Sequence, residues 1–230
     1  MRAHIGIVGV SPEGAALAHR LLYRRAAALA PDRDHPRVTL HNEPLALYIE
    51  AVRNEDWHGV GDLLRRSANI LAEAGAQFCF TPDNAVHHGI HLAETGSKIP
   101  WLAMTDLVAE RVAADGRKVV GLVGTRIVMT GSTYQTHLGL RGVQTLAPEP
   151  AEIDDLDGII FGELIYGRIH PDSRARALRI IENLQKRGCE ALILAASEAP
   201  LLFQDAPALG LPVYDAAETL VEGAIRRALD

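Results

Sequence analysis

The stretch GIVGVSPEG at residues 6–14 decides the fold, because it returns as GLVGTRIVMTG at residues 121–131, with its first glycines 115 positions apart. Two further segments repeat at nearly the same separation. AGAQFCFTPDNA, which begins at Ala74, parallels RGCEALILAASEA, which begins at Arg187, and IPWLAMTD parallels LPVYDAAE. A repeat of this length across the chain predicts two similar lobes.

Each repeat alternates short apolar runs with helical patterns. Eight runs have the length and composition of strands: HIGIVGV, RVTLH, AQFCFTP, PWLAM, KVVGLVG, GVQTL, EALILAA and PVYDA. Helical spacing of apolar residues covers 55–74, 172–187 and about 216–229. Gly188 is predicted to end the second of these helices. Strands that alternate with helices favour mostly parallel sheets. We therefore expect an α/β protein with a first lobe at 1–115, joined by a C-terminal helix at 213–230, and a second lobe at 116–212.

The parallel sheets also predict where a ligand binds. In open sheets of this kind ligands bind outside the carboxyl ends of the strands, and two facing lobes would place one cleft between two such ends. The loops expected to line the cleft are 10–13, 81–85, 125–126 and 195–198. His41, Asn42 and Glu43 close the run RVTLH and are expected near the same region.

Composition favours a small-molecule ligand. The chain has 230 residues, 48% of them hydrophobic, and a formal net charge of −6. No run of Lys and Arg with interleaved aromatics offers a surface for nucleic acid, so a small polar or acidic metabolite fits better. The N-terminal segment has no signal-peptide pattern, and no run of about 18 apolar residues could span a membrane. We therefore expect a cytoplasmic protein without a membrane partner.

The segment TPDNAVHHGIH at residues 81–91 holds one carboxylate and three imidazoles. Asp83 could transfer a proton, bind a metal or cap a helix. Asp83, His87 and His91 would align on a continuous helix, but no HExxH pattern or Cys cluster supports a metal site. We expect no metal here. His88 and His91 are interpreted as surface or packing residues.

The loop GVSPEG reads first as a good helix start. Ser11 is a suitable N-cap, Pro12 suits the first helical position, and Glu13 complements the positive end of the helix dipole. The loop lacks the glycine spacing of a dinucleotide site and the lysine of a nucleoside triphosphate site. In the second repeat, Thr125 is either a helix cap or a contact for a ligand carboxylate.

The chain as a whole resembles the aspartate/glutamate racemase family, whose relatives include hydantoin racemases, maleate isomerases and arylmalonate decarboxylases. The resemblance rests on GIVGVSPE, NEDWHGVGDLLRRSANILAEAGAQF, GLVGTR and RGCEALILAASEAPLLF, and covers nearly all 230 residues. It implies two pseudo-symmetric Rossmann-like lobes, a small carboxylate substrate, no cofactor and a homodimer. It also implies an isomerase of the racemase type that works without pyridoxal phosphate.

The resemblance implies two catalytic thiols, one in each strand-end loop, and this sequence departs at both places. Asp83 stands where the first cysteine is expected, and Ala196 stands where the second is expected. Cys79 and Cys189 align with neither position. They lie in apolar surroundings and are interpreted as small buried hydrophobic residues.

The absence of both thiols changes the roles expected of the residues in these two loops. Racemisation by two bases needs an acid/base on each face of the carbon, which Ala196 cannot supply. Asp83 is the expected acid/base, Ser197 the second catalytic candidate, and Glu198 an alternative to it. Residues expected to contact substrate are Ser11, Asn84, Ala85, His87, Thr125, Arg126, Arg168 and Glu198. Arg168 could instead form a surface salt bridge.

Three functions remain open on the sequence. The first is proton transfer next to a carboxylate, as in a racemase. The second is a decarboxylase or lyase that uses a single acid/base. The third is a binding protein that kept the carboxylate site without catalysis.

Overall fold

The computed structural model describes residues 2–29, 35–203 and 210–230 and divides into two compact units. Unit 1 comprises Met1–Met104 with Ala217–Asp230, and unit 2 comprises Thr105–Ala216. The chain therefore leaves unit 1 once and returns for its last helix, with the first crossing 11 residues before the predicted boundary at residue 115.

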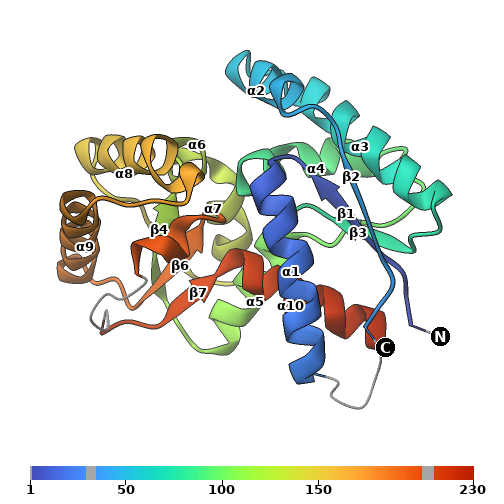
Figure 1. The fold of residues 1–230 in the computed structure, drawn as a ribbon. Coiled ribbons are helices and arrows are strands. Elements are labelled where there is room, and N and C mark those ends of the chain that lie inside the picture. Colours follow the sequence, from blue (N-terminus) through green and yellow to red (C-terminus); the bar gives the residue numbers. More distant parts are fainter. Residues whose placement is uncertain (1, 30–34, 204–209) are drawn as a thin grey trace. The chain divides into compact units, whose positions relative to one another are not determined.

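Unit 1 is built on a parallel sheet. Strands β1 (Ile5–Gly9), β2 (Val38–Asn42) and β3 (Phe78–Phe80) pair in the order β2-β1-β3 (Figure 1). Every residue of β1 is buried, so both faces of this strand are covered. Helices α1 (Pro12–Leu29) and α3 (Trp57–Glu73) pack against β1 and β2. Leu45–Arg53 forms α2, Ile90–Glu94 forms α4 and Ala216–Leu229 forms α10.

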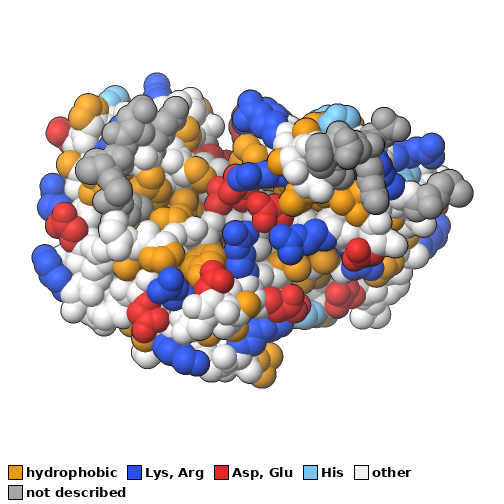
Figure 2. Space-filling view, turned by 90° about the horizontal axis from the view of Figure 1, so that it is seen from below, with side chains coloured by type: hydrophobic (Ala, Val, Ile, Leu, Met, Phe, Trp, Pro, Cys, Tyr) orange, Lys and Arg blue, Asp and Glu red, His pale blue; other side chains and the backbone are white. Residues whose placement is uncertain are grey.

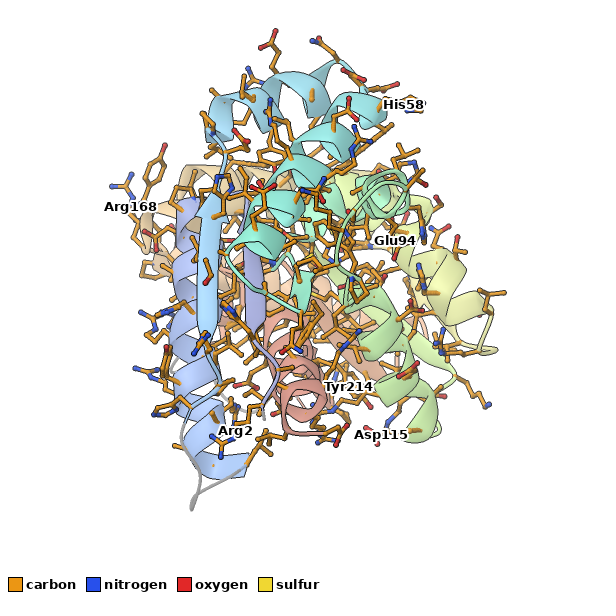
Figure 3. All side chains as sticks on the ribbon, turned by 90° about the vertical axis from the view of Figure 1, so that its right-hand side faces the viewer. Arg2, His58, Glu94, Asp115, Arg168 and Tyr214 are labelled. Carbon is orange, nitrogen blue, oxygen red and sulfur yellow. The ribbon has the colours of Figure 1, made fainter. Side chains whose placement is uncertain are left out.

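Unit 2 repeats this plan with one more strand. Its sheet has the order β5-β4-β6-β7, with β4 (Val119–Gly124), β5 (Gln144–Leu146), β6 (Ala191–Ala195) and β7 (Val213–Asp215) all parallel. The helices are α5 (Met104–Ala114), α6 (Arg126–Thr130), α7 (Ser132–Gly139), α8 (Pro150–Gly162) and α9 (Pro171–Lys186), with short 3₁₀ helices η2 (Leu164–Tyr166) and η3 (Ala199–Leu202). Figure 3 labels Tyr214 of β7 and Asp115 after α5, whose side chains form a 2.7 Å hydrogen bond.

One predicted strand is wrong. In the part of the chain that the structure describes, seven of the eight apolar runs form strands, but PWLAM contributes a single bridge between Trp101 and Cys79. Pro100 has no N–H to donate to a ladder, and α5 begins at Met104. Only the Pro100 carbonyl and the Leu102 N–H remain to pair with Cys79, at 3.0 and 2.8 Å.

In each unit, neighbouring residues pack closely around one glycine of the central strand. A Cβ added at Gly6 would lie 3.1–3.3 Å from Leu71, Ala76 and Cys79. A Cβ added at Gly121 would lie 3.0–3.1 Å from the equivalent residues of unit 2, which are Leu184, Cys189 and Leu192. The central strand of each sheet thus needs glycine so that the following helix and strand can pack onto it.

The repeat extends to the helix ends. Gly75 follows α3 and Gly188 follows α9, and both have a φ of 93°. This left-handed conformation after a helix is one that glycine adopts without steric penalty. It turns the chain into the strand after each helix, so the predicted stop at Gly188 is confirmed.

Surface and hydropathy add two further findings. On the face shown in Figure 2, both basic and acidic side chains are present. Across residues 2–29, 35–203 and 210–230, no helix is long and apolar enough to cross a membrane.

The glycine contacts generate the first prediction. Replacing Gly121 with Ala should destabilise unit 2 by about 1–3 kcal/mol, because the new methyl group is crowded on three sides. Urea unfolding followed by circular dichroism measures this change. Gly158→Ala is the matched control, since this exposed glycine within α8 has no neighbour within 4 Å of its added Cβ, and it should gain up to about 1 kcal/mol. Equal stability changes for the two variants would contradict the packing argument.

Candidate active site

Asp83 lies three residues beyond the end of β3, in the first of the predicted strand-end loops. Thr81 and Pro82 before it are buried, whereas Asp83 itself is partly exposed. Its Oδ2 atom accepts a 3.0 Å hydrogen bond from the backbone N–H of Ser11, which follows β1. Because β1 and β3 are paired neighbours, this contact joins the two loops at the carboxyl edge of the unit 1 sheet.

Asp83 does not act as a helix cap. The 3₁₀ helix η1 begins at the next residue and spans Asn84–Gly89, but the Asp83 side chain makes no capping hydrogen bond within the described chain. Its backbone is extended, with φ −86° and ψ 111°. The capping interpretation of Asp83 is therefore wrong, since its carboxylate is turned to the neighbouring loop.

Ser11 has two roles in this loop. Its Oγ accepts a 3.0 Å hydrogen bond from the N–H of Gly14, so the predicted N-cap of the helix that begins at Pro12 is confirmed. Its own N–H is the donor to Asp83. The start of α1 and the position of the carboxylate are therefore fixed by one residue.

His87 contacts the backbone of the Asp83 loop from a buried position. The ring is buried, and Nδ1 lies 2.8 Å from the carbonyl oxygen of Asp83. A carbonyl can only accept, so Nδ1 is the protonated nitrogen in this contact. Asn84 is buried beside it and Ala85 is partly buried. His91 lies apart from this loop, exposed on α4 and 3.5 Å from Glu94.

No metal centre is found in the described parts of the chain. Across residues 2–29, 35–203 and 210–230, no group of three His, Cys, Asp or Glu side chains is placed to hold a metal ion.

Unit 1 also buries two polar residues that the sequence analysis missed. Tyr48 on α2 is 1% exposed and Ser67 on α3 is fully buried. Ser67 Oγ is 3.0 Å from Nδ1 of His41, which belongs to β2. The sequence offered little indication of Tyr48, because a tyrosine on the apolar face of a short helix usually marks core packing. The Tyr48 ring is indeed buried in the core.

Strand register identifies the counterpart of Asp83 in unit 2. Gly6 of β1 pairs with Cys79 of β3, and Gly121 of β4 pairs with Leu192 of β6. Asp83 comes four residues after Cys79, and Ala196 comes four residues after Leu192. The two residues thus occupy equivalent positions in their units, and Ala196 has no group that could gain or lose a proton.

The positive charge in the loop after β4 belongs to Arg126, which makes its contacts with α8. The Arg126 N–H donates to Oδ1 of Asp157 at 2.6 Å, and the Arg126 guanidinium pairs with Asp154, so both contacts are with α8. Thr125 precedes it, and its buried Oγ1 has no hydrogen-bond partner among the residues that the structure describes. Of the two, Thr125 is the better placed to meet a ligand.

The other residues predicted for the site lie after β6 and after η2. Ser197 and Glu198 follow β6 and are partly buried, directly before η3. Arg168 follows η2, outside the strand-end loops, and projects outward in Figure 3. Its guanidinium lies over the exposed Tyr166 ring, 5.3 Å from the centroid.

Both cysteines are buried free thiols, which confirms their interpretation as small hydrophobic residues. Cys79 lies within β3, and burial raises the pKa of its thiol well above the ordinary range. Burial also raises the pKa of Cys189, whose Sγ donates to the carbonyl oxygen of Ala191 at 2.9 Å. Neither sulfur is at a strand end.

Comparison with known proteins identifies the family. A family model described as Asp/Glu/Hydantoin racemase matches residues 7–224. The chain belongs to this family. Its expected α/β fold of two parallel sheets flanked by helices is shown by the structure and by solved members.

Three solved structures illustrate the likeness. A candidate Asp/Glu racemase from Yersinia pestis is 25% identical, with a TM-score of 0.90 over 99% of this chain and 100% of its own. An aspartate racemase homologue from Pyrococcus horikoshii OT3 is 25% identical, with a TM-score of 0.87 over 100% of both chains. The aspartate racemase of Picrophilus torridus, at 21% identity, shows the same fold with a TM-score of 0.71 over 98% of this chain and 94% of its own.

The thiol burial generates a second prediction. In the native protein neither cysteine should react with an aromatic disulfide reagent that releases a coloured thiolate, because both are buried and their pKa values are raised. In guanidinium chloride both should react. Rapid labelling of the folded protein would show that a thiol is exposed and ionisable after all.

Proposed function

We propose that this racemase-family protein transfers a proton, without a cofactor, at a carbon next to the carboxylate of a small amino acid or dicarboxylate. Asp83 is the acid/base. The observation that carries this proposal is the Asp83 carboxylate at the sheet edge, partly exposed and tied by the Ser11 N–H at 3.0 Å. A fixed and reachable ionisable group is what proton transfer to a bound molecule requires.

The contacts of Asp83 favour this role over a purely structural one. The Ser11 N–H stabilises the ionised carboxylate and limits its rotation. His87 holds the backbone of the same residue through its carbonyl oxygen at 2.8 Å. In the proposed reaction Asn84, which follows Asp83 in the same loop, orients a substrate carboxylate and stabilises the enediolate-like charge that forms when the proton leaves.

A decarboxylase or lyase is the second candidate, and Ala196 is the observation that favours it. A racemase with two bases needs a second proton carrier, and the position equivalent to Asp83 offers a methyl group. Loss of CO₂ leaves an electron pair on carbon that needs one proton donor. Asp83 would supply that proton and regain one from solvent.

The Asp83 role predicts the effect of a single substitution. Asp83→Asn should lower turnover by at least about 10²-fold, because the amide cannot exchange a proton although it can still accept from Ser11. Ligand binding should persist. The measurement is α-deuterium incorporation into candidate amino acids and dicarboxylates in deuterium oxide, followed by mass spectrometry, with ligand-induced thermal stabilisation as the binding assay.

Asp62→Asn is the control for this experiment. Asp62 is an exposed aspartate on α3 that pairs with Arg65, so its substitution should leave turnover unchanged. Full activity of Asp83→Asn would rule out the acid/base role. Thermal stabilisation by a ligand with no turnover in the wild type would instead favour a non-catalytic binding protein.

Ala196 leads to a stereochemical prediction. If Asp83 is the single acid/base, deuterium should be incorporated with retention of configuration, or a decarboxylated product should form as one enantiomer, since the proton arrives on one face. Chiral chromatography of the product measures this. Equal accumulation of both enantiomers at the same rate as deuterium exchange would show that a second acid/base operates.

A further inference from the structure

Asn42 ends β2, and its side chain lies over the end of the neighbouring strand. The residue pairs with Gly9 in the parallel register of β2 and β1. A Cβ added at Gly9 would lie 2.2 Å from Oδ1 and 2.4 Å from Nδ2 of Asn42. The carboxamide therefore occupies the space that a side chain at position 9 would fill, and glycine at the end of β1 makes room for it.

The Asn42 amide covers Gly9 and is itself accessible. Gly9 is buried although it is the last residue of its strand, whereas Asn42 is exposed. Packing alone does not require an amide here, because a small apolar side chain would cover Gly9 equally well. A carboxamide adds an acceptor, Oδ1, and a donor, Nδ2, that an apolar side chain lacks. These two atoms are what Asn42 can offer to a ligand.

Strand pairing brings this amide to the same edge of the sheet as Asp83. Ser11 follows Gly9 by two residues, and its N–H donates to Oδ2 of Asp83 at 3.0 Å. The strands of unit 1 are parallel and run in the order β2-β1-β3, so Asn42, Ser11 and Asp83 all come from their carboxyl ends. Ligands of open parallel sheets bind at this edge.

The charge of this edge favours a cationic group on the ligand. The segments that follow the three strands are residues 10–13, 43–44 and 81–85. They contain Glu13, Glu43 and Asp83 but no Lys or Arg. Arg66 of α3 pairs with Glu43 at 2.9 Å. The carboxylates outside this pair attract an ammonium group and repel a further carboxylate.

We propose that Asn42 is a specificity-determining residue, whose Oδ1 accepts a hydrogen bond from an ammonium group of the ligand. Gly9 supports this role because it leaves room for the amide. The inference rests on the proposed function and narrows it: an amino acid has the donor, and a dicarboxylate without nitrogen does not. The hydrogen bond orients the ligand and takes no part in proton transfer.

Two substitutions at Asn42 separate an acceptor from a donor. Asn42→Asp keeps an oxygen acceptor and adds negative charge, so this variant should bind an amino acid at least as tightly as the wild type. Asn42→Ala removes the acceptor and should weaken binding by about 10–100-fold. Asn54→Ala is the control, because Asn54 is an exposed asparagine that follows α2, and its affinity should equal that of the wild type.

The probes differ by the ammonium group alone. They are both enantiomers of aspartate and of glutamate, with succinate and glutarate as the same diacids without nitrogen. Isothermal titration calorimetry measures the Kd of each, and the wild type should bind the amino acid more tightly than its diacid. For an amino acid that is turned over, Asn42→Ala should raise KM with a smaller change in kcat.

Gly9→Ala tests the position of the amide. Its methyl group would displace the Asn42 carboxamide, so the loss of affinity should match that of Asn42→Ala. Gly59→Ala is the matched control, because a Cβ added there lies 2.3 Å from a side-chain oxygen of Asp56, at the start of α3. This variant should bind like the wild type. Circular dichroism shows whether both variants are folded.

The outcomes are distinct. Equal loss of affinity in Asn42→Asp and Asn42→Ala overturns the inference, because it would make Nδ2 the donor to a ligand carboxylate. Unchanged affinity in Asn42→Ala also overturns it, as does a wild type that binds none of the amino acids or binds the diacids as tightly. Amino-acid binding that needs Asn42, without turnover, supports the inference, and in that case only the proposed function fails.

Discussion

The close approach of strands at two glycines is the constraint on which the rest of the structure depends. A Cβ atom at Gly6 or at Gly121 would lie only 3.0–3.3 Å from the next strand and from the end of the helix before it, which is tighter than ordinary van der Waals contact. The packing holds β1 against β3 and β4 against β6 in equivalent registers. Each register then determines which residue comes to the strand end, Asp83 in unit 1 and Ala196 in unit 2.

That geometry explains how one scaffold can keep its shape while its chemistry changes. The amide of Ser11 lies beside the strand-end loop whatever residue stands at position 83, because strand pairing places it there. A carboxylate can accept from that amide and remain reachable. At position 196 a methyl group satisfies packing but offers no proton, so the two halves of the repeat are similar in fold and unequal in chemistry.

Local sequence was sufficient for most of the fold. Apolar runs predicted seven of the strands in the described chain, helix-start chemistry predicted the cap at Ser11, and Gly188 predicted a helix end, because each depends on neighbours a few residues away. The run PWLAM failed because Pro100 and the start of α5 limit it to one bridge. Local sequence left helix capping open as one alternative for Asp83, because the contact that excludes it is with Ser11, 72 positions distant.

The sequence by itself determined the internal repeat, the two parallel sheets, the burial of Cys79 and Cys189, and the presence of Asp83 and Ala196 at corresponding places. Only the tertiary structure decided what these side chains contact. It placed Asp83 on the amide of Ser11 and Arg126 on the carboxylates of α8. The reason is physical: hydrophobic periodicity records which face of an element is buried, whereas hydrogen-bond and charge partners are chosen by segments that meet only after folding.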